Sequence, residues 1–364
     1  MRSSWGWLAV LLSSGCYVHD PRPGSTPKDA RSGIAPQGLD ATRICGAWGA
    51  AVGTGDRFAR GHVSYPDLDP LGCYVPVRYE DGPMPTVGAI PAGCGYVPGD
   101  AAAALVHEAE RYERIAAGDG AELPVELACA LAPEARNAAA LVNARTLRSL
   151  AARTDARTYA YAAVATFGYG RPSHGKTPVA HWLPGDACPA DKDVDLSLFG
   201  VNVERAGRAA LAFAGGVAPV VTFSGGAIHS AQTEAFLLDY IATCRLSVPQ
   251  DRVLLDPCAD HTHTNMRNTG RLVVALAART AYLVTDDGLQ SGYLQEWTAF
   301  DLIGGSIDQR SLRDWGYLAG SWRQASEGMR SGFWFTPYRF WADPTLRTLT
   351  CDDALRDTRR GGTP

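Results

Sequence analysis

Residues 219–226 read Pro-Val-Val-Thr-Phe-Ser-Gly-Gly, and this stretch decides the fold that the sequence predicts. Residues 220–223 are apolar or β-branched, which is typical of a short strand buried on both faces. The two glycines allow the chain to turn tightly directly after the strand. Apolar residues at helical spacing follow at 233–243. The stretch is therefore predicted to be a strand that leads through a turn into a helix.

The same order of strand and helix repeats on both sides of this stretch. Further strands are predicted at 194–199, 252–256 and 281–285, and further helices at 203–213 and 265–278. This alternation predicts an α/β fold, with a mostly parallel, doubly wound (Rossmann-like) sheet in the C-terminal half of the chain. Such sheets bind ligands beyond the carboxyl ends of their strands.

The chain before this part has a different character. Residues 41–100 are rich in Gly and Pro and contain Cys, which predicts short strands and turns. Residues 101–117 and 127–152 are Ala-rich with Leu and Val at helical spacing, which predicts helices. We therefore expect a Cys-containing N-terminal region at 41–190, followed by an α/β domain at 191–350.

An aromatic-rich extension ends the predicted α/β domain. We interpret its side chains mainly as core packing, and an apolar lid for a lipid-like ligand is the alternative. The aromatic residues are Trp315, Tyr317, Trp322, Phe333, Trp334, Phe335, Tyr338, Phe340 and Trp341.

The first residues of the chain resemble an export signal. Arg2 is followed by a short apolar stretch at 7–12 and by Ser13-Ser14-Gly15-Cys16, an order similar to a signal peptide that ends in a lipobox. Leu12 lies one position further from Cys16 than a lipobox usually requires, and an ordinary cleaved signal is the alternative. Residues 17–40 are rich in Pro, Gly and Ser and predict a flexible linker. We expect an exported lipoprotein of the cell envelope, held at the membrane by lipidated Cys16.

The cysteine count agrees with export. If Cys16 carries lipid, eight of the nine cysteines remain, and no Cys-x-x-Cys pair occurs among them. An even number without this motif favours disulfides over zinc. The alternative is that several are buried free thiols, for which Cys244 and Cys258 are the best candidates.

Charge and hydropathy exclude other classes of partner. The formal net charge is −4 and no basic stripe is present, so no nucleic-acid partner is expected. No apolar run approaches the roughly 20 residues of a membrane-spanning helix. The sequence also contains no motif that requires a cofactor.

Polar residues gather where the predicted strands end. Ser224, Gly225 and Gly226 follow one strand, and their backbone N–H groups are candidates for holding an anion. The candidate residues that follow this turn and the next two strands are Glu234, Thr262, Asn265, Arg267, Thr285 and Asp286.

These segments together resemble the YdcF/SanA/ElyC-like family of bacterial envelope proteins, a domain of unknown function. The resemblance covers roughly residues 193–300. Its members have a strand ending in Ser-Gly-Gly, a Glu-Ala helix start, a segment with Thr and Asn, and a strand ending in Val-Thr. The matching residues are Ser224, Gly225, Gly226, Glu234, Ala235, Thr262, Asn265, Val284 and Thr285, and either Arg205 or Arg208 corresponds to an Arg in the first helix.

The resemblance implies a role in envelope biogenesis and a phosphate-bearing ligand, such as an isoprenoid phosphate. In this reading Ser224, Gly225 and Gly226 cradle the anionic group through their N–H groups, and the other candidates line the site. The chain also departs from the family, because Ala259, His261, Thr264, Leu289 and Gly292 stand where the pattern has Ser, Asn, Glu, His and Arg.

These departures leave two alternatives. The first is a non-catalytic scaffold or partner-binding module that has kept the fold and lost the chemistry. The second is a metal-dependent hydrolase, in which His261 and His263, with nearby carboxylates, bind a divalent metal that activates water.

Overall fold

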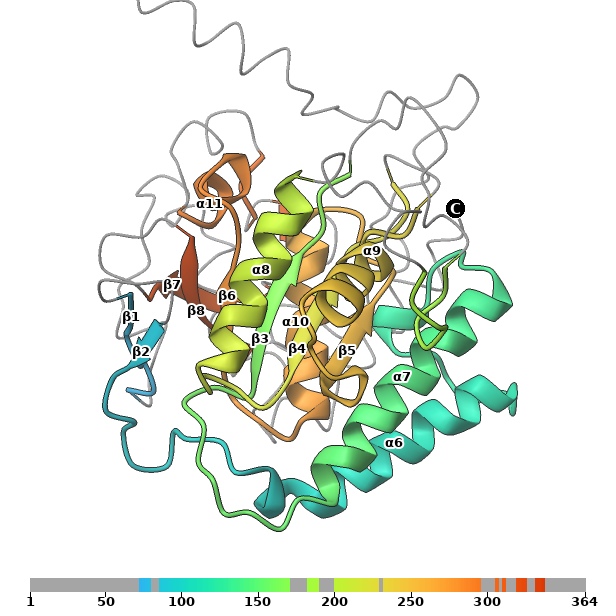
Figure 1. Ribbon diagram of the computed structural model, residues 1–364, viewed down its shortest axis with the longest axis horizontal. Coiled ribbons are helices and arrows are strands. Elements are labelled where there is room, and N and C mark those ends of the chain that lie inside the picture. Colours follow the sequence, from blue (N-terminus) through green and yellow to red (C-terminus); the bar gives the residue numbers. More distant parts are fainter. Residues whose placement is uncertain are drawn as a thin grey trace, which may run out of the picture.

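A six-stranded sheet forms the centre of the protein (Figure 1). The computed structural model describes residues 72–79, 85–170, 182–189, 200–228, 232–295, 305–307, 310–311, 319–325 and 331–337. The strand order is β5-β4-β3-β6-β8-β7. The first four strands of this order are parallel, and β8 and β7 extend the sheet in the antiparallel sense. The strands are β3 (Ala163–Phe167), β4 (Val221–Ser224), β5 (Val253–Asp256), β6 (Ala281–Val284), β7 (Ser321–Gln324) and β8 (Gly332–Thr336).

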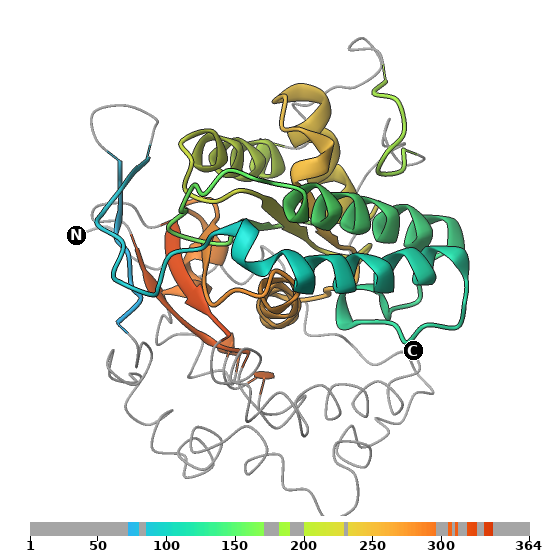
Figure 2. The same ribbon diagram turned by 90° about the horizontal axis from the view of Figure 1, so that it is seen from below.

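The α/β class and the mostly parallel sheet are confirmed, although the sheet is mixed. β3, β4, β5 and β6 are buried along their whole length, because helices cover both faces of the sheet (Figure 2). α8 (Gly200–Ala214) and α9 (Glu234–Tyr240) lie on one face, and α10 (Thr262–Ala275) lies on the other. This division follows from the strand order, since the chain moves outward from β3 to β5 and then crosses back to β6.

The centre of the sheet was not predicted. β3 comes from residues that the sequence assigned to the N-terminal, partly helical region, so the sheet extends across the expected boundary at residue 190. Alanine has a high helix propensity, and here tertiary contacts override it, because Ala163 and Ala165 lie completely buried between two parallel strands. The strand expected at 194–199 lies outside the described residues.

Two long helices protect the edge of the sheet at β5. α6 (Ala102–Ala117) and α7 (Pro133–Ala151) pack against each other, and α7 also contacts β5. The side-chain amide of Asn143 donates to the carbonyl of Leu255 at 3.0 Å and accepts from its N–H at 2.7 Å. The hydroxyl of Thr146 donates to the carbonyl of Val253 at 2.5 Å. These contacts replace the partner strand that an open edge lacks.

The remaining elements are short and lie around this body. They are β1 (Val77–Tyr79), β2 (Pro85–Val87), η1 (Pro98–Ala101), η2 (Val125–Leu127), the π-helical turn η5 (Ile241–Arg245) that continues α9, η6 (Gln250–Arg252) and α11 (Leu289–Leu294). Within the described residues, no helix combines the length and the apolar character needed to cross a membrane.

The aromatic residues of the extension that the structure describes are core residues. Phe333, Trp334 and Phe335 in β8 are completely buried, and Trp322 in β7 is 5% exposed. The core-packing interpretation is therefore confirmed for these four. Trp315, Tyr317, Tyr338, Phe340 and Trp341 lie outside the described residues.

Three disulfides join the described cysteines: Cys73–Cys94, Cys129–Cys258 and Cys188–Cys244. The alternative of free thiols was wrong for Cys244 and Cys258, because the fold brings each beside a cysteine more than 50 residues away in the sequence. Disulfides of this kind are typical of proteins from an oxidising, exported environment. Cys16, Cys45 and Cys351 lie outside the described residues.

Candidate functional site

The carboxyl ends of the four parallel strands meet at one edge of the sheet. The chain leaves β3 at Gly168, β4 at Gly225, β5 at Pro257 and β6 at Thr285. β4 lies on one side of β3 and β6 on the other, so the crossovers depart in opposite directions from this point. Ligands of doubly wound sheets bind at such a switch point.

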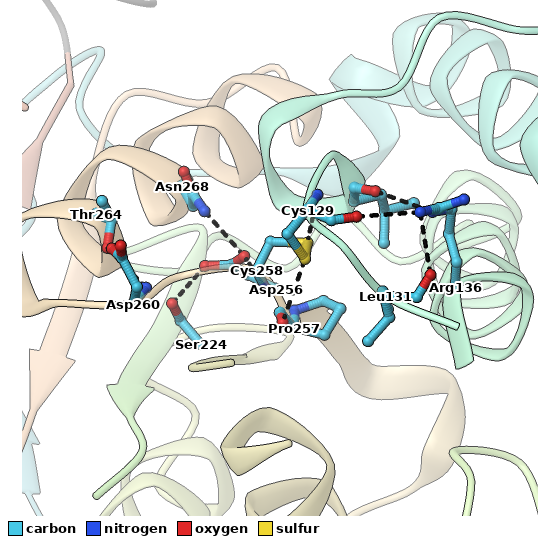
Figure 3. The surroundings of a disulfide bond; sticks show 11 residues. Cys129, Leu131, Arg136, Ser224, Asp256, Pro257, Cys258, Asp260, Thr264 and Asn268 are labelled. Carbon is cyan, nitrogen blue, oxygen red and sulfur yellow. Dashed lines mark hydrogen bonds between the residues drawn. A yellow bond between two sulfur atoms is a disulfide. The ribbon is translucent and has the colours of Figure 1, made fainter. Parts of the chain in front are cut away.

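A buried hydrogen-bonded cluster lies at the ends of β4 and β5 (Figure 3). The Ser224 hydroxyl lies 2.5 Å from Oδ2 of Asp256. It also lies 2.7 Å from Oδ1 of Asn265. The other oxygen of Asp256 accepts from Asn268 Nδ2 at 2.9 Å and from the N–H of Cys258 at 3.0 Å. The sequence therefore correctly placed Ser224 beside Asn265, and it missed Asp256, whose position as the last residue of a predicted strand was the available signal.

This cluster is part of the interior and favours the protonated form of Asp256. Ser224, Asp256 and Asn265 are at most 5% exposed, and burial raises the pKa of Asp256 to about 7, although its hydrogen bonds act in the opposite direction. A hydroxyl has one proton, and Ser224 faces two acceptor oxygens. A protonated Asp256 that donates to Ser224, which in turn donates to Asn265, satisfies all three groups.

The Ser-Gly-Gly turn does not offer its N–H groups to an anion. The N–H of Gly225 donates to the carbonyl of Asp256 at 2.9 Å, and that of Gly226 donates to the carbonyl of Ala259 at 2.6 Å. The first two N–H groups of α9, from Glu234 and Ala235, donate to the carbonyls of Gly226 and Gly225. The expectation that this turn holds an anion through free N–H groups was wrong. The N–H groups of Gly225 and Gly226 bind carbonyls at the end of β5 and in the loop after it, and the carbonyls of the same glycines bind the start of α9.

Three other predicted site residues are Thr285, Arg267 and Thr262, and each is buried or half-buried. The hydroxyl of Thr285 is completely buried and lies 2.6 Å from Oε1 of Gln290. Arg267 is half-buried and donates through Nε to Oδ1 of Asn268 at 3.0 Å. Thr262 is the first residue of α10 and is half-buried, while Thr264 rather than Thr262 caps the N-terminus, accepting from the N–H of His261 at 2.8 Å.

A buried ion pair occupies the switch point. Arg205 of α8 donates through Nε to Oδ2 of Asp286 at 2.6 Å and through Nη1 to the carbonyls of Phe167 and Gly168 at 2.7 and 2.8 Å. Burial tends to raise the pKa of Asp286, but the charge and hydrogen bonds of Arg205 outweigh it, so that the pKa is lowered. The sequence left Arg205 and Arg208 as alternatives, and only Arg205 reaches this position.

Arg208 forms exposed contacts one turn further along α8. It pairs with Asp287 at 3.1 Å and with Glu204 at 2.5 Å, and the side chains of both carboxylates are more than 40% exposed. Arg205 is only 2% exposed. Both arginines therefore pair with carboxylates, but only the pair of Arg205 is buried.

Asn202, which the sequence did not single out, fixes the loop after β3. Its side-chain Oδ1 accepts from the N–H of Tyr169 at 2.8 Å, and its Nδ2 donates to the carbonyl of Tyr169 at 3.0 Å. The Tyr169 ring is 41% exposed, with the Arg205 guanidinium 5.6 Å from its centroid. The first two turns of α8 thus bind the loop that leaves the central strand.

Glu234 lies between the ends of β3 and β4. A Cβ atom built on Gly168 would lie 2.2 Å from Cβ of Glu234, and one built on Gly225 would lie 2.7 Å from its Oε2. The carboxyl therefore sits directly against both glycine backbones. Burial raises the pKa of Glu234 to about 7, and the positive charge of Arg205 offsets only part of this effect.

The histidines predicted for the metal alternative lie near the start of α10. The rings of His261 and His263 are 5.6 Å apart and perpendicular, in an edge-to-face contact. Among the described residues, no group of three or more His, Cys, Asp or Glu side chains could hold a metal ion. The described part of the chain thus gives the metal-hydrolase alternative no support.

Comparisons with models of protein families, with curated proteins and with solved structures found no match. The structure defines this chain as an α/β protein with a mostly parallel, mixed sheet and three disulfides among the described cysteines. Its candidate site is the charged centre at the switch point, formed by Arg205, Glu234 and Asp286.

Proposed function

We propose that this protein is an exported cell-envelope protein that binds a phosphate-bearing ligand at the switch point between β3 and β6. The observation that carries the proposal is the attachment of the first two turns of α8 to the loop after β3 through Asn202 and Arg205. This attachment directs the N-terminus of α8 toward the edge where doubly wound sheets bind ligands.

The N-terminus of α8 is the part of the switch point that we propose holds the anion. The first N–H groups of a helix have no acceptor within the helix, and the helix dipole adds partial positive charge there. α8 has 15 residues and is the next described element after the central strand β3 along the chain. Anions bind at helix N-termini in this position in many α/β proteins.

Replacing Gly200 with proline is expected to weaken the binding of inorganic phosphate about tenfold or more. Proline is tolerated in the first turn of a helix but has no N–H group, and a hydrogen bond to a charged group is worth roughly 1.5–3 kcal/mol. Calorimetric titration of the full chain with inorganic phosphate measures the change in Kd.

Gly200→Ala is the matched control, because it keeps the N–H and the structure has open space for a Cβ at this position. The alanine variant should bind phosphate as the wild type does. Equal affinities for the alanine and proline variants would show that the N-terminus of α8 is not the anion site.

The proposal extends to the cell envelope through the N-terminal segment. The disulfides fit an oxidising compartment, and a lipid on Cys16 would place the site near membrane-bound phosphate esters such as isoprenoid phosphates. Cys16→Ser is expected to move the protein from the membrane fraction to the soluble fraction of expressing bacteria. Retention of the serine variant in the membrane fraction would contradict lipid anchoring.

A scaffold without a ligand is the second candidate, and one observation favours it. Ser224, Asn265 and Thr285 were expected to line the site, and all three are buried in contacts with other side chains of the protein. The titration separates the two candidates, because the scaffold alternative predicts no phosphate binding by the wild type.

A further inference from the structure

Glu234 is a surplus carboxyl at the switch point. Arg205 directs Nε and Nη2 to Asp286 and Nη1 to two backbone carbonyls, so Asp286 already balances its charge. None of the described residues donates a hydrogen bond to the carboxyl of Glu234, although this residue is only 9% exposed. A second, unpaired carboxyl in such a position costs stability, since burial opposes its ionisation.

The backbone makes room for this carboxyl. The glycines at the ends of two neighbouring strands, Gly168 and Gly225, lie so close to Glu234 that any side chain would overlap it. Both glycines are buried and the Glu234 side chain reaches between them. The arrangement therefore keeps a buried carboxyl beside the point where the proposed ligand binds.

The protonation of Glu234 suits proton transfer. Burial raises its pKa to about 7, so that a large fraction of the molecules carry the proton at neutral pH. A phosphate group nearby would raise the pKa further, because like charges disfavour ionisation. Perturbed carboxyls in ligand sites are candidates for general acids.

We propose that the site hydrolyses phosphate monoesters and that Glu234 is the general acid that protonates the leaving alcohol oxygen. This inference rests on the proposed binding of a phosphate-bearing ligand. Water forms a bond to phosphorus as the bond between phosphorus and the alcohol oxygen breaks, and the carboxyl proton of Glu234 goes to that oxygen. A proton of the attacking water then returns through the phosphate product to Glu234. The products are the alcohol and inorganic phosphate.

The test compares two substrates in the full chain. Phenyl phosphate has a poor leaving group that needs a proton, whereas 2,4-dinitrophenyl phosphate has a good one that leaves as a stable anion. General acid catalysis typically contributes 10²–10⁴-fold. Glu234→Gln is therefore expected to lower kcat/KM for phenyl phosphate by about 10²-fold or more and to change that for the dinitrophenyl ester less than tenfold.

The dependence on pH gives a second readout. Because the acid form of Glu234 is the active one, the rate with phenyl phosphate should fall as the pH rises above about 7. The rate with the dinitrophenyl ester should lack this fall. Glu134→Gln is the matched control, since Glu134 is an exposed residue in the first turn of α7, and this variant should behave as the wild type.

The stability of Glu234→Gln shows whether a loss of activity could come from unfolding. Because the folded-state pKa is raised from 4.5 to about 7, stability is lost as the pH rises from about 4.5 through 7 and stays low above that range, and glutamine removes this loss. Glu234→Gln should therefore be at least as stable as the wild type at pH 8 in urea unfolding. A fall in activity cannot then be explained by unfolding.

Three outcomes would overturn the inference. Equal losses for the two esters would show that Glu234 acts on the structure of the site and not on the leaving group. Inorganic phosphate binding without turnover of either ester would leave the proposed binding function intact and remove hydrolysis. Absence of phosphate binding in the wild type would instead remove the proposed function, and this inference with it.

Discussion

Replacing both Cys129 and Cys258 with alanine is expected to lower the free energy of unfolding by about 4–5 kcal/mol. This disulfide joins residues 129 positions apart, and loop closure in the unfolded chain gives the larger stabilisation to the longer loop. The Cys188–Cys244 bond lies inside this loop and shortens it, but halving a loop changes the entropy term by only about 0.6 kcal/mol. Urea unfolding under non-reducing conditions measures the loss.

The same bond holds the loop that follows β5 against the loop before α7 (Figure 3). The N–H of Cys258 donates to Oδ1 of Asp256. The carbonyl of the next residue, Ala259, accepts from the N–H of Gly226. The Cys73–Cys94 bond spans 21 residues and serves as the comparison, with an expected loss of about 3 kcal/mol for its alanine pair. A loss below about 2 kcal/mol for the Cys129 and Cys258 pair would contradict the account from loop length.

Replacing Asp286 with asparagine is expected to lower the free energy of unfolding by about 3–5 kcal/mol. The change leaves the guanidinium of Arg205, which is 2% exposed, in the interior without its ion-pair partner. Breaking a buried pair by removing one partner carries this cost because the remaining charge stays desolvated. Urea unfolding at pH 7 measures the effect.

The neighbouring residue supplies the control for this prediction. Asp287 pairs with Arg208, and its side chain is 60% exposed, so Asp287→Asn should cost less than about 1 kcal/mol. The pKa of Asp286 is lowered in the folded state, so the pair stabilises the wild type above about pH 4 and loses its effect as the pH falls further. Equal losses for the two asparagine variants would show that burial of the pair is unimportant.

The alternation of strand and helix was predictable from residues 219–285. The segments β4, α9, β5, α10 and β6 appear in the predicted order and within a few residues of the predicted limits. Their strands are short apolar runs and their helices carry apolar residues at helical spacing, so local patterns are sufficient. β3 was missed because its alanines carry no strand signal of their own and become a strand only between β4 and β6.

The candidate site was predictable in part. Asn265 was correctly expected near Ser224, because Ser224 ends β4, Asn265 follows β5, and these parallel strands end at the same edge. Arg205 and Arg208 could not be separated, since residues three apart on a helix project in similar directions, and only the packing of α8 on the sheet shows which one is buried. The N–H groups of Gly225 and Gly226 also looked free, because their acceptors lie more than 30 residues away in the sequence.

The sequence by itself determined the fold class, the parallel direction of the central strands and the edge where the polar residues gather. These properties follow from local backbone preferences and from the periodicity of apolar residues. Only the tertiary structure decided that β3 is the central strand, that Cys258 pairs with Cys129, and that Arg205 meets Asp286 beside Glu234. Each of these depends on contacts between residues far apart in the chain, which form only when the helices close over the sheet.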